Sequence, residues 1–400
     1  MKTLYICYFG LREPLVQTQV LPYLRQLAAA GIGVNLLTFE PQMKQSWSRE
    51  ELETQRQDLS HEGITWICRP YHKRPSLPAT AFDVVIGACV AVRLARARKI
   101  DVLHARSHLP LAMAVLARAL TRCRLIFDVR GLMAEEYVDI GNWKEDSLPF
   151  RLIKTLERIG LRQADQVVVL TRRMSEWLVK EDLADAGRIV IIPCCTDVRR
   201  FESKASSESA SNRLELVYAG TATGLHLLEE VGRFFIQLRQ RQPNAFLQIL
   251  THSPAADIAS LFQSLGLTPE DFSVVAAQPD EVPTYLCRAR IGVSFRKATF
   301  AQIAASPAKI SEYLAAGLPV ISNSGIGDLD DLLTNEGVGF VIKSFHDDAY
   351  EEAARHILKL VELPDIRQRC QRVAKKYFDL VDVGGKGYLE VYRRIALQTK

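Results

Sequence analysis

The chain has 400 residues, too many for one compact hydrophobic core, so its length predicts two domains. Hydrophobic residues make up 48% of the sequence and charged residues 24%, values that exclude a largely disordered protein. The longest apolar runs, such as residues 109–120 with Arg118 inside, fall short of the ~20 residues that a membrane span requires. The short apolar segment after Lys2 lacks a small-residue cleavage site, so it predicts a first strand rather than an export signal.

Positive charge is concentrated in the first half of the chain. The net charge of +5 divides into +7 for residues 1–200 and −2 for the rest, and residues 71–124 hold ten Lys or Arg against two acids, Asp83 and Asp101. Such a face could dock on anionic lipid at the inner side of a membrane or bind a phosphate-bearing acceptor, or it could be a solvated Arg-rich helix surface. The lack of interleaved aromatic residues disfavours a nucleic-acid partner.

The cysteines indicate a reducing compartment. No pair has C-x-x-C or zinc-site spacing, and most stand in apolar segments, so we expect reduced core thiols at Cys7, Cys68, Cys89, Cys123, Cys194, Cys195, Cys287 and Cys370. Together with the missing export signal, this predicts a cytoplasmic protein.

Short β-rich runs alternate with longer amphipathic runs, which indicates a parallel sheet with crossover helices. In the first half, strands are expected at residues 3–9, 34–39, 64–68, 101–105, 124–128, 166–170 and 188–192. Helices are expected between them at residues 14–30, 82–98, 109–121, 150–163 and 172–183.

A polar, serine-rich stretch from Glu202 to Asn212 predicts a linker, after which the alternation restarts. Strands are expected at residues 214–220, 245–250, 272–276, 291–295 and 319–322, and helices at residues 225–241, 255–265, 280–289, 307–316, 347–362, 364–378 and 386–399. The last helix follows Gly384-Gly385 and could pack back on the first domain. The predicted fold is therefore α/β, with two Rossmann-like doubly wound domains: residues 1–198 with 386–400, and residues 199–385.

Both halves contain a strand that ends in glycine before a helix, at Gly10 and Gly220. Ligands of such sheets bind beyond the carboxyl ends of the strands. Two domains joined by one linker would place these edges opposite each other, so we expect a ligand cleft between them.

The segment from Ser306 to Ile321 carries the most chemical information. Ser306 is expected to cap a helix and Pro307 to occupy its first position, while Gly317 ends the helix. The amino terminus of a helix suits a phosphate, and Lys309 in the first turn adds a full charge. Glu312 follows on the same face and could accept hydrogen bonds from both ribose hydroxyls. A capped surface helix with an internal Lys309–Glu312 pair is the alternative.

The residue pattern of this segment resembles the nucleotide-binding segment of the retaining glycosyltransferases of family 4, the group 1 enzymes of the GT-B superfamily. The pattern S-P-x-K-x-x-E-Y-x-A-x-G-x-P-V-I is met from Ser306 onward. The resemblance extends over nearly the whole chain, through Tyr8-Phe9-Gly10, His104-Ala-Arg106, Asp128-Val-Arg130-Gly131, the hinge at 192–197 and Tyr218-Ala-Gly220-Thr221.

The resemblance implies a nucleotide-diphosphate sugar as donor and a GT-B fold. By position, Glu312 would bind the ribose, Ser306, Pro307 and Lys309 would flank the phosphates, and Gly10 would lie in the loop over the donor. Gly220 and Thr221 would form the turn near the β-phosphate. The acceptor would be a glycan or a lipid-linked molecule in surface polysaccharide or glycolipid assembly.

Two departures from the family pattern stand out. Ala304 occupies the place of a glutamate found eight residues before the ribose-binding one, and Thr221 to His226 lack the Arg/Lys pair that holds the β-phosphate in many members. Arg296 and Lys297 could supply that charge, or they could be an exposed basic pair.

Three residues of the first half are candidates for a catalytic role on the acceptor side. His104 and Arg106 alternate on one strand and so point to one side of the sheet. Arg130 stands at the next strand end with Glu135 and Glu136 downstream, and because unpaired charges are rarely buried we expect it in a cleft rather than in the core. A lone histidine on a strand is normally structural, so His104 could have either a structural role or a direct role in the site.

The resemblance also implies retention of anomeric configuration, no protein nucleophile and no metal or other cofactor. Asp328-Leu329-Asp330 is a D-x-D sequence like the metal site of another glycosyltransferase fold, but its position predicts a helix cap. A nucleotide-sugar 2-epimerase or hydrolase, and a non-catalytic nucleotide-sugar-binding scaffold, are the alternatives on the same fold. A periplasmic sugar-binding protein is disfavoured by the missing export signal.

Overall fold

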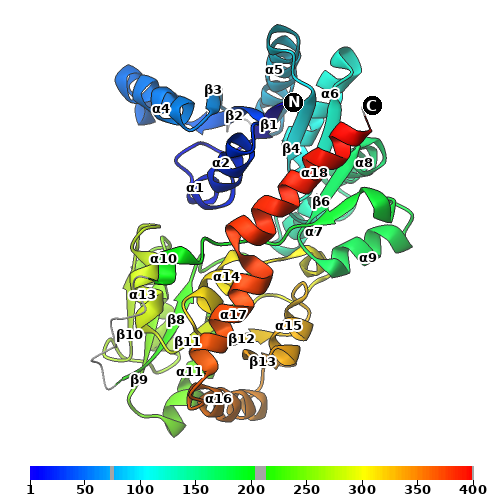
Figure 1. The fold of residues 1–400 in the computed structure, drawn as a ribbon. Coiled ribbons are helices and arrows are strands. Elements are labelled where there is room, and N and C mark those ends of the chain that lie inside the picture. Colours follow the sequence, from blue (N-terminus) through cyan, green and yellow to red (C-terminus); the bar gives the residue numbers. More distant parts are fainter. Residues whose placement is uncertain (73–75, 203–212, 399–400) are drawn as a thin grey trace. The chain divides into compact units, whose positions relative to one another are not determined.

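The computed structural model describes residues 1–72, 76–202 and 213–398. It divides into two compact units, Met1–Ile192 with Gly384–Lys400, and Pro193–Val383 (Figure 1). We refer to them as the first and the second unit. The predicted linker from Glu202 to Asn212 lies outside the described residues except for Glu202.

Within the described residues, the first unit forms a seven-stranded parallel sheet in the order β3-β2-β1-β4-β5-β6-β7. The strands are β1 (Lys2–Cys7), β2 (Gly33–Pro41), β3 (Ile64–Tyr71), β4 (Val102–Arg106), β5 (Arg124–Asp128), β6 (Gln166–Val169) and β7 (Ile189–Ile191). The helices are α1 (Pro14–Gln19), α2 (Leu21–Ala29), α3 (Met43–Ser46), α4 (Arg49–His61), α5 (Ser76–Arg98), α6 (His108–Thr121), α7 (Met133–Asp139), α8 (Leu148–Gln163), α9 (Arg172–Lys180) and α18 (Lys386–Leu397).

The structure adds elements that the sequence pattern did not predict and divides one that it did. The helix expected at residues 14–30 is two helices, because Pro22 in the first turn of α2 has no N–H to continue α1. Helix α4 is mostly polar, and its apolar periodicity is weak. Its start is nevertheless fixed by a capping box, in which the Ser48 and Glu51 side chains each accept a bond from the other's backbone N–H.

The residues described for the second unit form a six-stranded parallel sheet in the order β10-β9-β8-β11-β12-β13. The strands are β8 (Leu214–Ala219), β9 (Ala245–Leu250), β10 (Phe272–Val275), β11 (Ile291–Ser294), β12 (Val320–Asn323) and β13 (Gly339–Ile342). The helices are α10 (Arg199–Glu202), α11 (Leu228–Arg241), α12 (Ala255–Ser264), α13 (Val282–Arg288), α14 (Ala308–Ala315), α15 (Leu329–Asn335), α16 (Asp347–Val361) and α17 (Ile366–Phe378).

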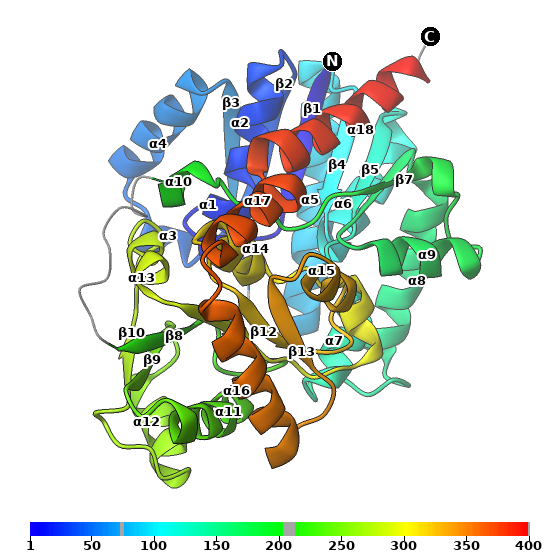
Figure 2. The same cartoon turned by 60° about the horizontal axis from the view of Figure 1, so that its bottom comes forward.

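The second unit has an apolar core on each face of its sheet. Helices α11, α12 and α16 cover one face with Phe234, Phe262 and Ile357, and helices α13, α14, α15 and α17 cover the other (Figure 2). Parallel strands with helices on both faces are buried on both sides, which explains their continuous apolar runs. The prediction of two Rossmann-like α/β domains is confirmed.

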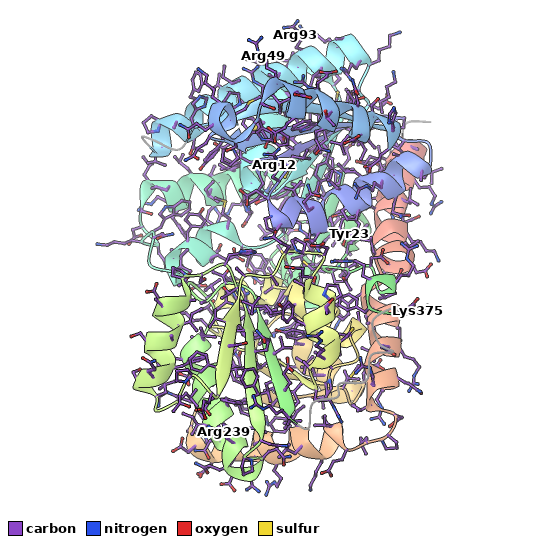
Figure 3. The ribbon with its side chains drawn as sticks, turned by 90° about the vertical axis from the view of Figure 1, so that its left-hand side faces the viewer. Arg12, Tyr23, Arg49, Arg93, Arg239 and Lys375 are labelled. Atoms are coloured by element: carbon purple, nitrogen blue, oxygen red, sulfur yellow. The ribbon has the colours of Figure 1, made fainter. Side chains whose placement is uncertain are left out.

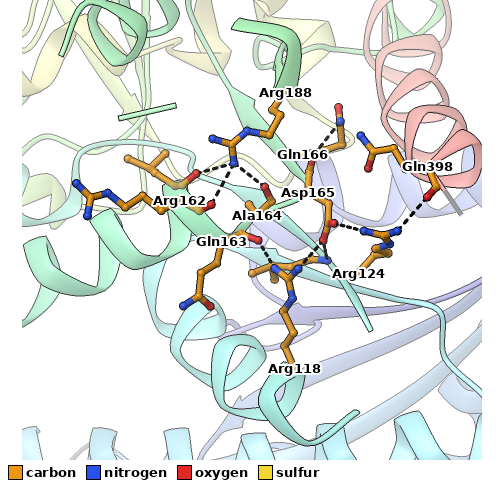
Figure 4. A network of polar contacts seen from close by, with 11 residues as sticks. Arg118, Arg124, Arg162, Gln163, Ala164, Asp165, Gln166, Arg188 and Gln398 are labelled. Carbon is orange, nitrogen blue, oxygen red and sulfur yellow. Dashed lines mark hydrogen bonds and ion pairs between the residues drawn. The ribbon is translucent and has the colours of Figure 1, made fainter. Parts of the chain in front are cut away.

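The chain leaves the second unit through a short π-helical segment, Leu380–Gly385, and its last helix, α18, belongs to the first unit. Helix α18 packs beside α2, where the Tyr23 and Tyr388 rings lie 4.9 Å apart. At its end, Arg124 of β5 donates to the Gln398 carbonyl and pairs with Asp165, which also pairs with Arg118 of α6 (Figure 4). These contacts connect the carboxyl end of the chain to the first sheet.

One expectation about membranes is wrong. The sequence analysis found no apolar run of spanning length, but residues 77–98 of α5 are long and apolar enough, by length and composition, to cross a bilayer. The helix starts six residues before the predicted position, which adds apolar residues at its beginning. All eight cysteines lie in described segments as free thiols, and seven of them are buried, as expected. Cys89 is exposed, so the expectation of a core thiol at that position is wrong.

Candidate active site

The order of the second sheet marks one edge as a ligand site. Strand order runs outward from β8 to β10 in one direction and from β11 to β13 in the other, so the direction reverses between β8 and β11. In open α/β sheets, ligands bind at this point, beyond the carboxyl ends of the strands. The turn Gly220-Thr221 follows β8, and Arg296-Lys297 follows β11 by one residue, so the predicted turn and the predicted source of charge lie at the same edge.

Helix α14 is fixed over the seam between these two strands by Tyr313. Its hydroxyl accepts a bond from the Ala219 amide at 2.7 Å and donates to the Val293 carbonyl at 3.3 Å. A Cβ at Gly292 would lie 2.4 Å from the Tyr313 ring, so this strand position has to be glycine. Tyr313 is part of the family pattern, but the pattern predicts no role for it, because its hydrogen-bond partners are 20 and 94 residues away.

Lys309 is buried at this edge without a hydrogen bond. Its side chain is 8% exposed, and its ammonium has no hydrogen-bond partner among the described residues. The ammonium lies 4.1 Å from the centre of the Tyr218 ring, a cation–π contact. Burial, and then the charge of Arg296, lower the pKa of Lys309 well below its usual value. A buried ammonium with only an aromatic face beside it is unfavourable until an anion binds.

Gly220 makes room for this ammonium. A Cβ at this position would lie 3.1 Å from the Lys309 Nζ and 3.3 Å from its Cε, and the φ of +125° is one that residues with side chains rarely adopt. The glycine after β8 therefore lets the ammonium reach the end of the strand.

Arg296 provides a second cation that is rigidly held. Its Nε donates to the Gln302 Oε1 at 2.8 Å, and its backbone is clamped by Asn323, which bonds both its N–H and its carbonyl. Its Nη1 lies 3.5 Å from the His226 ring nitrogen Nε2. Burial, then Lys309 and Arg296, lower the pKa of His226 to about 2, so this imidazole is neutral. Lys297 is exposed, and its backbone N–H donates to the Leu225 carbonyl.

Glu312 has a partly buried carboxylate with no hydrogen bond from any described residue. Burial raises its pKa, and the charges of Arg200 and Lys309 oppose that shift. An acceptor of this kind, one helical turn from Lys309, can take hydrogen bonds from ligand hydroxyls. The predicted pair Lys309 and Glu312 is thus brought to one edge together with Gly220, Thr221 and Arg296.

Two details predicted for the start of this helix are wrong. The Ser306 hydroxyl does not cap α14; it accepts a bond from the Cys194 N–H at 3.1 Å. Pro307 is the cap residue rather than the first helical residue, and α14 starts at Ala308. The local sequence pattern could not show that the backbone N–H of Cys194, in the segment after β7, donates to Ser306. Pro307 makes no side-chain cap bond, and the Ile310 N–H bonds the Pro307 carbonyl. The amides of Ala308 and Lys309 are the ones that this helix start can offer to a ligand.

Ala304, where the family pattern has glutamate, is fully buried at the end of a 3₁₀ turn, Phe300–Ala304. Gln302 in the same turn is also fully buried and holds Arg296. Like Tyr313, the residues Gln302, His226 and Tyr218 lie at this edge without a role predicted from the sequence pattern. Only the spacing of Gln302, ten residues before Glu312, could have drawn attention to it. The predicted cap Asp328 makes no side-chain cap of α15; instead, Asp330 accepts from the Gly325 N–H.

In the first unit, the three predicted acceptor-side residues surround Asp128 at the end of β5. His104 and Arg106 are almost completely buried, with ring Nε2 and Nη1 at 3.8 and 3.6 Å from the Asp128 carboxylate. Arg130 lies 3.8 Å from it with a side chain 9% exposed. Burial works to raise the pKa of Asp128, but Arg130, His104 and Arg106 outweigh it and lower the pKa to about 2.

Helix α18 completes this cluster. The Tyr388 hydroxyl donates to Asp128 at 2.7 Å, and the Tyr392 hydroxyl lies 2.9 Å from the His104 Nδ1. His104 is therefore held within the unit, which favours its structural reading. Asp128 supplies a buried counter-charge for the partly exposed Arg130, and the downstream acid Glu135 pairs with Lys154. The expected place of Arg130 in a cleft stays a prediction.

Gly10 follows β1, at the point where the first sheet reverses between β1 and β4. A Cβ at Gly10 would lie 2.7 Å from Pro41 and 2.9 Å from the carboxylate of Glu40, which also accepts from the Leu11 N–H. This close packing explains the glycine. A direct contact of Gly10 with a donor stays a prediction.

Comparison with known proteins gives two family matches that together span most of the chain. Residues 16–195 match a glycosyl transferase 4-like domain, and residues 200–377 match the glycosyl transferases group 1. No curated protein matches the chain by sequence.

Solved structures share the fold at low sequence identity. The sucrose-phosphate synthase (tll1590) of Thermosynechococcus elongatus superposes with a TM-score of 0.74 at 16% identity and full coverage of both chains. Anabaena Alr3699/HepE in complex with UDP-glucose gives 0.67 at 15% identity, covering 98% of this chain and 100% of that one. WaaG, a glycosyltransferase involved in lipopolysaccharide biosynthesis, gives 0.66 at 15% identity, covering 97% and 98%. These structures show that the chain has the GT-B fold. The two family matches show that the chain belongs to the group 1 glycosyltransferases.

Proposed function

We propose that this glycosyltransferase moves a sugar from a UDP- or GDP-type nucleotide-diphosphate sugar to a glycan or lipid-linked acceptor, with retention of anomeric configuration. The observation that carries the donor assignment is the buried, unbonded ammonium of Lys309 beside Arg296, with the free carboxylate of Glu312 one turn away. A diphosphate would satisfy the cations, and ribose hydroxyls would satisfy the carboxylate. The Alr3699/HepE structure with UDP-glucose supports this class of donor.

In the proposed reaction, the bond between the anomeric carbon and the diphosphate oxygen breaks, and a bond to the acceptor oxygen forms. The acceptor proton passes to the departing phosphate, so no protein base is assigned. Lys309, Arg296 and the amide groups at the start of α14 would stabilise the negative charge that develops on the leaving group. Ser306, Pro307, Gly220, Thr221 and Lys297 would shape the surroundings of the phosphates.

We propose that no metal is needed, because two fixed cations would offset the diphosphate charge. Activity should then survive treatment with a chelator. Arg106 and Arg130 of the first unit are proposed for the acceptor side, where Arg130 retains some exposure. A cytoplasmic role in surface polysaccharide or glycolipid assembly is part of the proposal, and the free thiols are compatible with that compartment.

The test is product analysis with a panel of UDP- and GDP-sugars, with and without a lipid-linked or oligosaccharide acceptor. A new glycoside with the donor's anomeric configuration, formed only with acceptor, is the expected result. Turnover of the donor without acceptor would instead indicate a 2-epimerase or hydrolase. Binding of nucleotide sugar without any turnover would indicate a non-catalytic scaffold and overturn the proposal.

A further inference from the structure

The first unit exposes a stripe of large apolar side chains on two neighbouring helices. On α5, Phe82 and Val85 are 53% and 55% exposed, and on α6, Leu116 and Leu120 are 50% and 63% exposed. The helices pack against each other, and a groove of about 820 Å³ runs between them, lined by these helices from Val85 to Ala97 and by Leu116 and Leu120. Outward helix faces of globular proteins are normally polar, so an apolar face of this kind indicates an interaction surface.

Helix α5 is built into the unit and does not stand apart as a membrane span. Its Asp83 is buried and accepts bonds from the Tyr8 hydroxyl and from the backbone N–H of His72. Gly87 lies so close to α6 that a Cβ would be 2.4 Å from the Met113 sulfur, and Ala91 is fully buried. A helix held along the whole of one side can lie in a membrane surface while the unit keeps its fold.

The charges around this stripe are of one sign. Residues 84–100 and 102–124 contain no acidic residue. Of the two acids in this region, Asp83 is buried and Asp101 accepts a bond from the Lys2 N–H. Arg118 and Arg124 are engaged by Asp165, as Figure 4 shows, so their charge is offset.

The arginines that remain are placed for an external anion. Arg93 and Arg122 are exposed, and Figure 3 shows Arg93 directed away from the ribbon. Arg96 is exposed beside the groove and donates to the Leu120 carbonyl, which brings it near the apolar stripe. Lys73 and Arg74 lie outside the described residues. An apolar stripe with cations at its rim and no exposed acid on α5 or α6 matches the interface of a bilayer, with acyl chains beneath anionic headgroups.

We propose that the α5–α6 face docks on an anionic lipid bilayer, with Phe82, Val85, Leu116 and Leu120 entering the boundary between headgroups and acyl chains. Arg93, Arg96 and Arg122 would lie at the level of the lipid phosphates. The assignment deepens the proposed function by naming a lipid surface as partner, since a membrane-held enzyme would meet a lipid-linked acceptor there.

The experiment is sedimentation of the full chain with vesicles of phosphatidylcholine alone or mixed equally with phosphatidylglycerol. We expect binding to the mixed vesicles that weakens with salt. Arg93→Glu should weaken it by at least roughly fivefold, the worth of one lost cation near an anionic surface. The double variant Leu116→Asp, Leu120→Asp should abolish it, and both variants should retain the wild-type thermal midpoint.

Matched controls lie elsewhere on the molecule. Lys375→Glu on α17 exchanges an exposed cation, and Val179→Asp on α9 exchanges an apolar side chain that is 44% exposed; both should bind vesicles like wild type. Equal sedimentation of wild type and the Leu116/Leu120 variant, or a stable dimer in light scattering that this variant disrupts, would overturn the docking proposal. Binding of UDP, followed by calorimetry, is independent of this face. Failure of the wild-type chain to bind UDP in calorimetry would count against the proposed donor site and not against docking.

Discussion

Replacing Lys309 by methionine should weaken binding of the donor nucleotide without destabilising the fold. Methionine keeps a straight apolar side chain that can still contact the Tyr218 ring, while it removes an ammonium that is 8% exposed and has no hydrogen-bond partner among the described residues. The uncompensated burial costs on the order of 1 kcal/mol, so the ligand-free variant should be as stable as wild type or slightly more stable. The structure therefore predicts opposite signs for stability and for binding.

The loss in binding follows from the charge. A hydrogen bond to a charged group contributes about 1.5–3 kcal/mol, so Lys309→Met should weaken binding of UDP or GDP, whichever binds wild type, by roughly 10- to 100-fold. Isothermal titration gives the affinity, and urea unfolding gives the stability. Lys297→Met is the matched control, because Lys297 is exposed at the same edge, and it should lose less. Wild-type affinity in Lys309→Met, or a stability loss above about 2 kcal/mol, would refute the reasoning.

Three further predictions concern single positions. Glu312→Ala should weaken binding of the same nucleotide roughly 10-fold or more without unfolding the protein, because it removes the free acceptor; unchanged affinity in calorimetry would contradict the ribose site. Gly220→Ala should lower the thermal midpoint and the affinity together, since its Cβ would meet Lys309 at 3.1 Å at a φ of +125°; a midpoint equal to wild type would argue against the strain. The pKa of Asp128 is lowered to about 2 from 3.8, so the stability it contributes is present above pH 3.8 and is lost as the pH falls towards 2. Urea unfolding across this range should show a loss of about 2 kcal/mol that is absent in Asp128→Asn; parallel curves would be inconsistent with a lowered pKa.

Much of the fold could be predicted because its signals are local. The alternation of β-rich and amphipathic runs is produced by parallel strands buried on both faces, and it locates most elements to within a few residues. Polar α4 and the short α7 and β13 carry weak periodicity, and they were missed for that reason. The placement of Lys309 and Glu312 on one face of α14 could also be predicted, because residues three apart share a helix face.

Other properties depend on contacts between residues far apart in the chain. Ser306 bonds a backbone group 112 residues away instead of capping its own helix, and Tyr388 reaches Asp128 across 260 residues. The sequence shows that residues 71–124 are basic, but not that Arg118 and Arg124 are paired with Asp165 while Arg93 is exposed beside an apolar stripe. Local patterning thus determined which elements form and which helix could receive a phosphate. Only tertiary packing decided which charges are buried, paired or exposed, because burial and partner choice depend on segments that meet only in the folded chain.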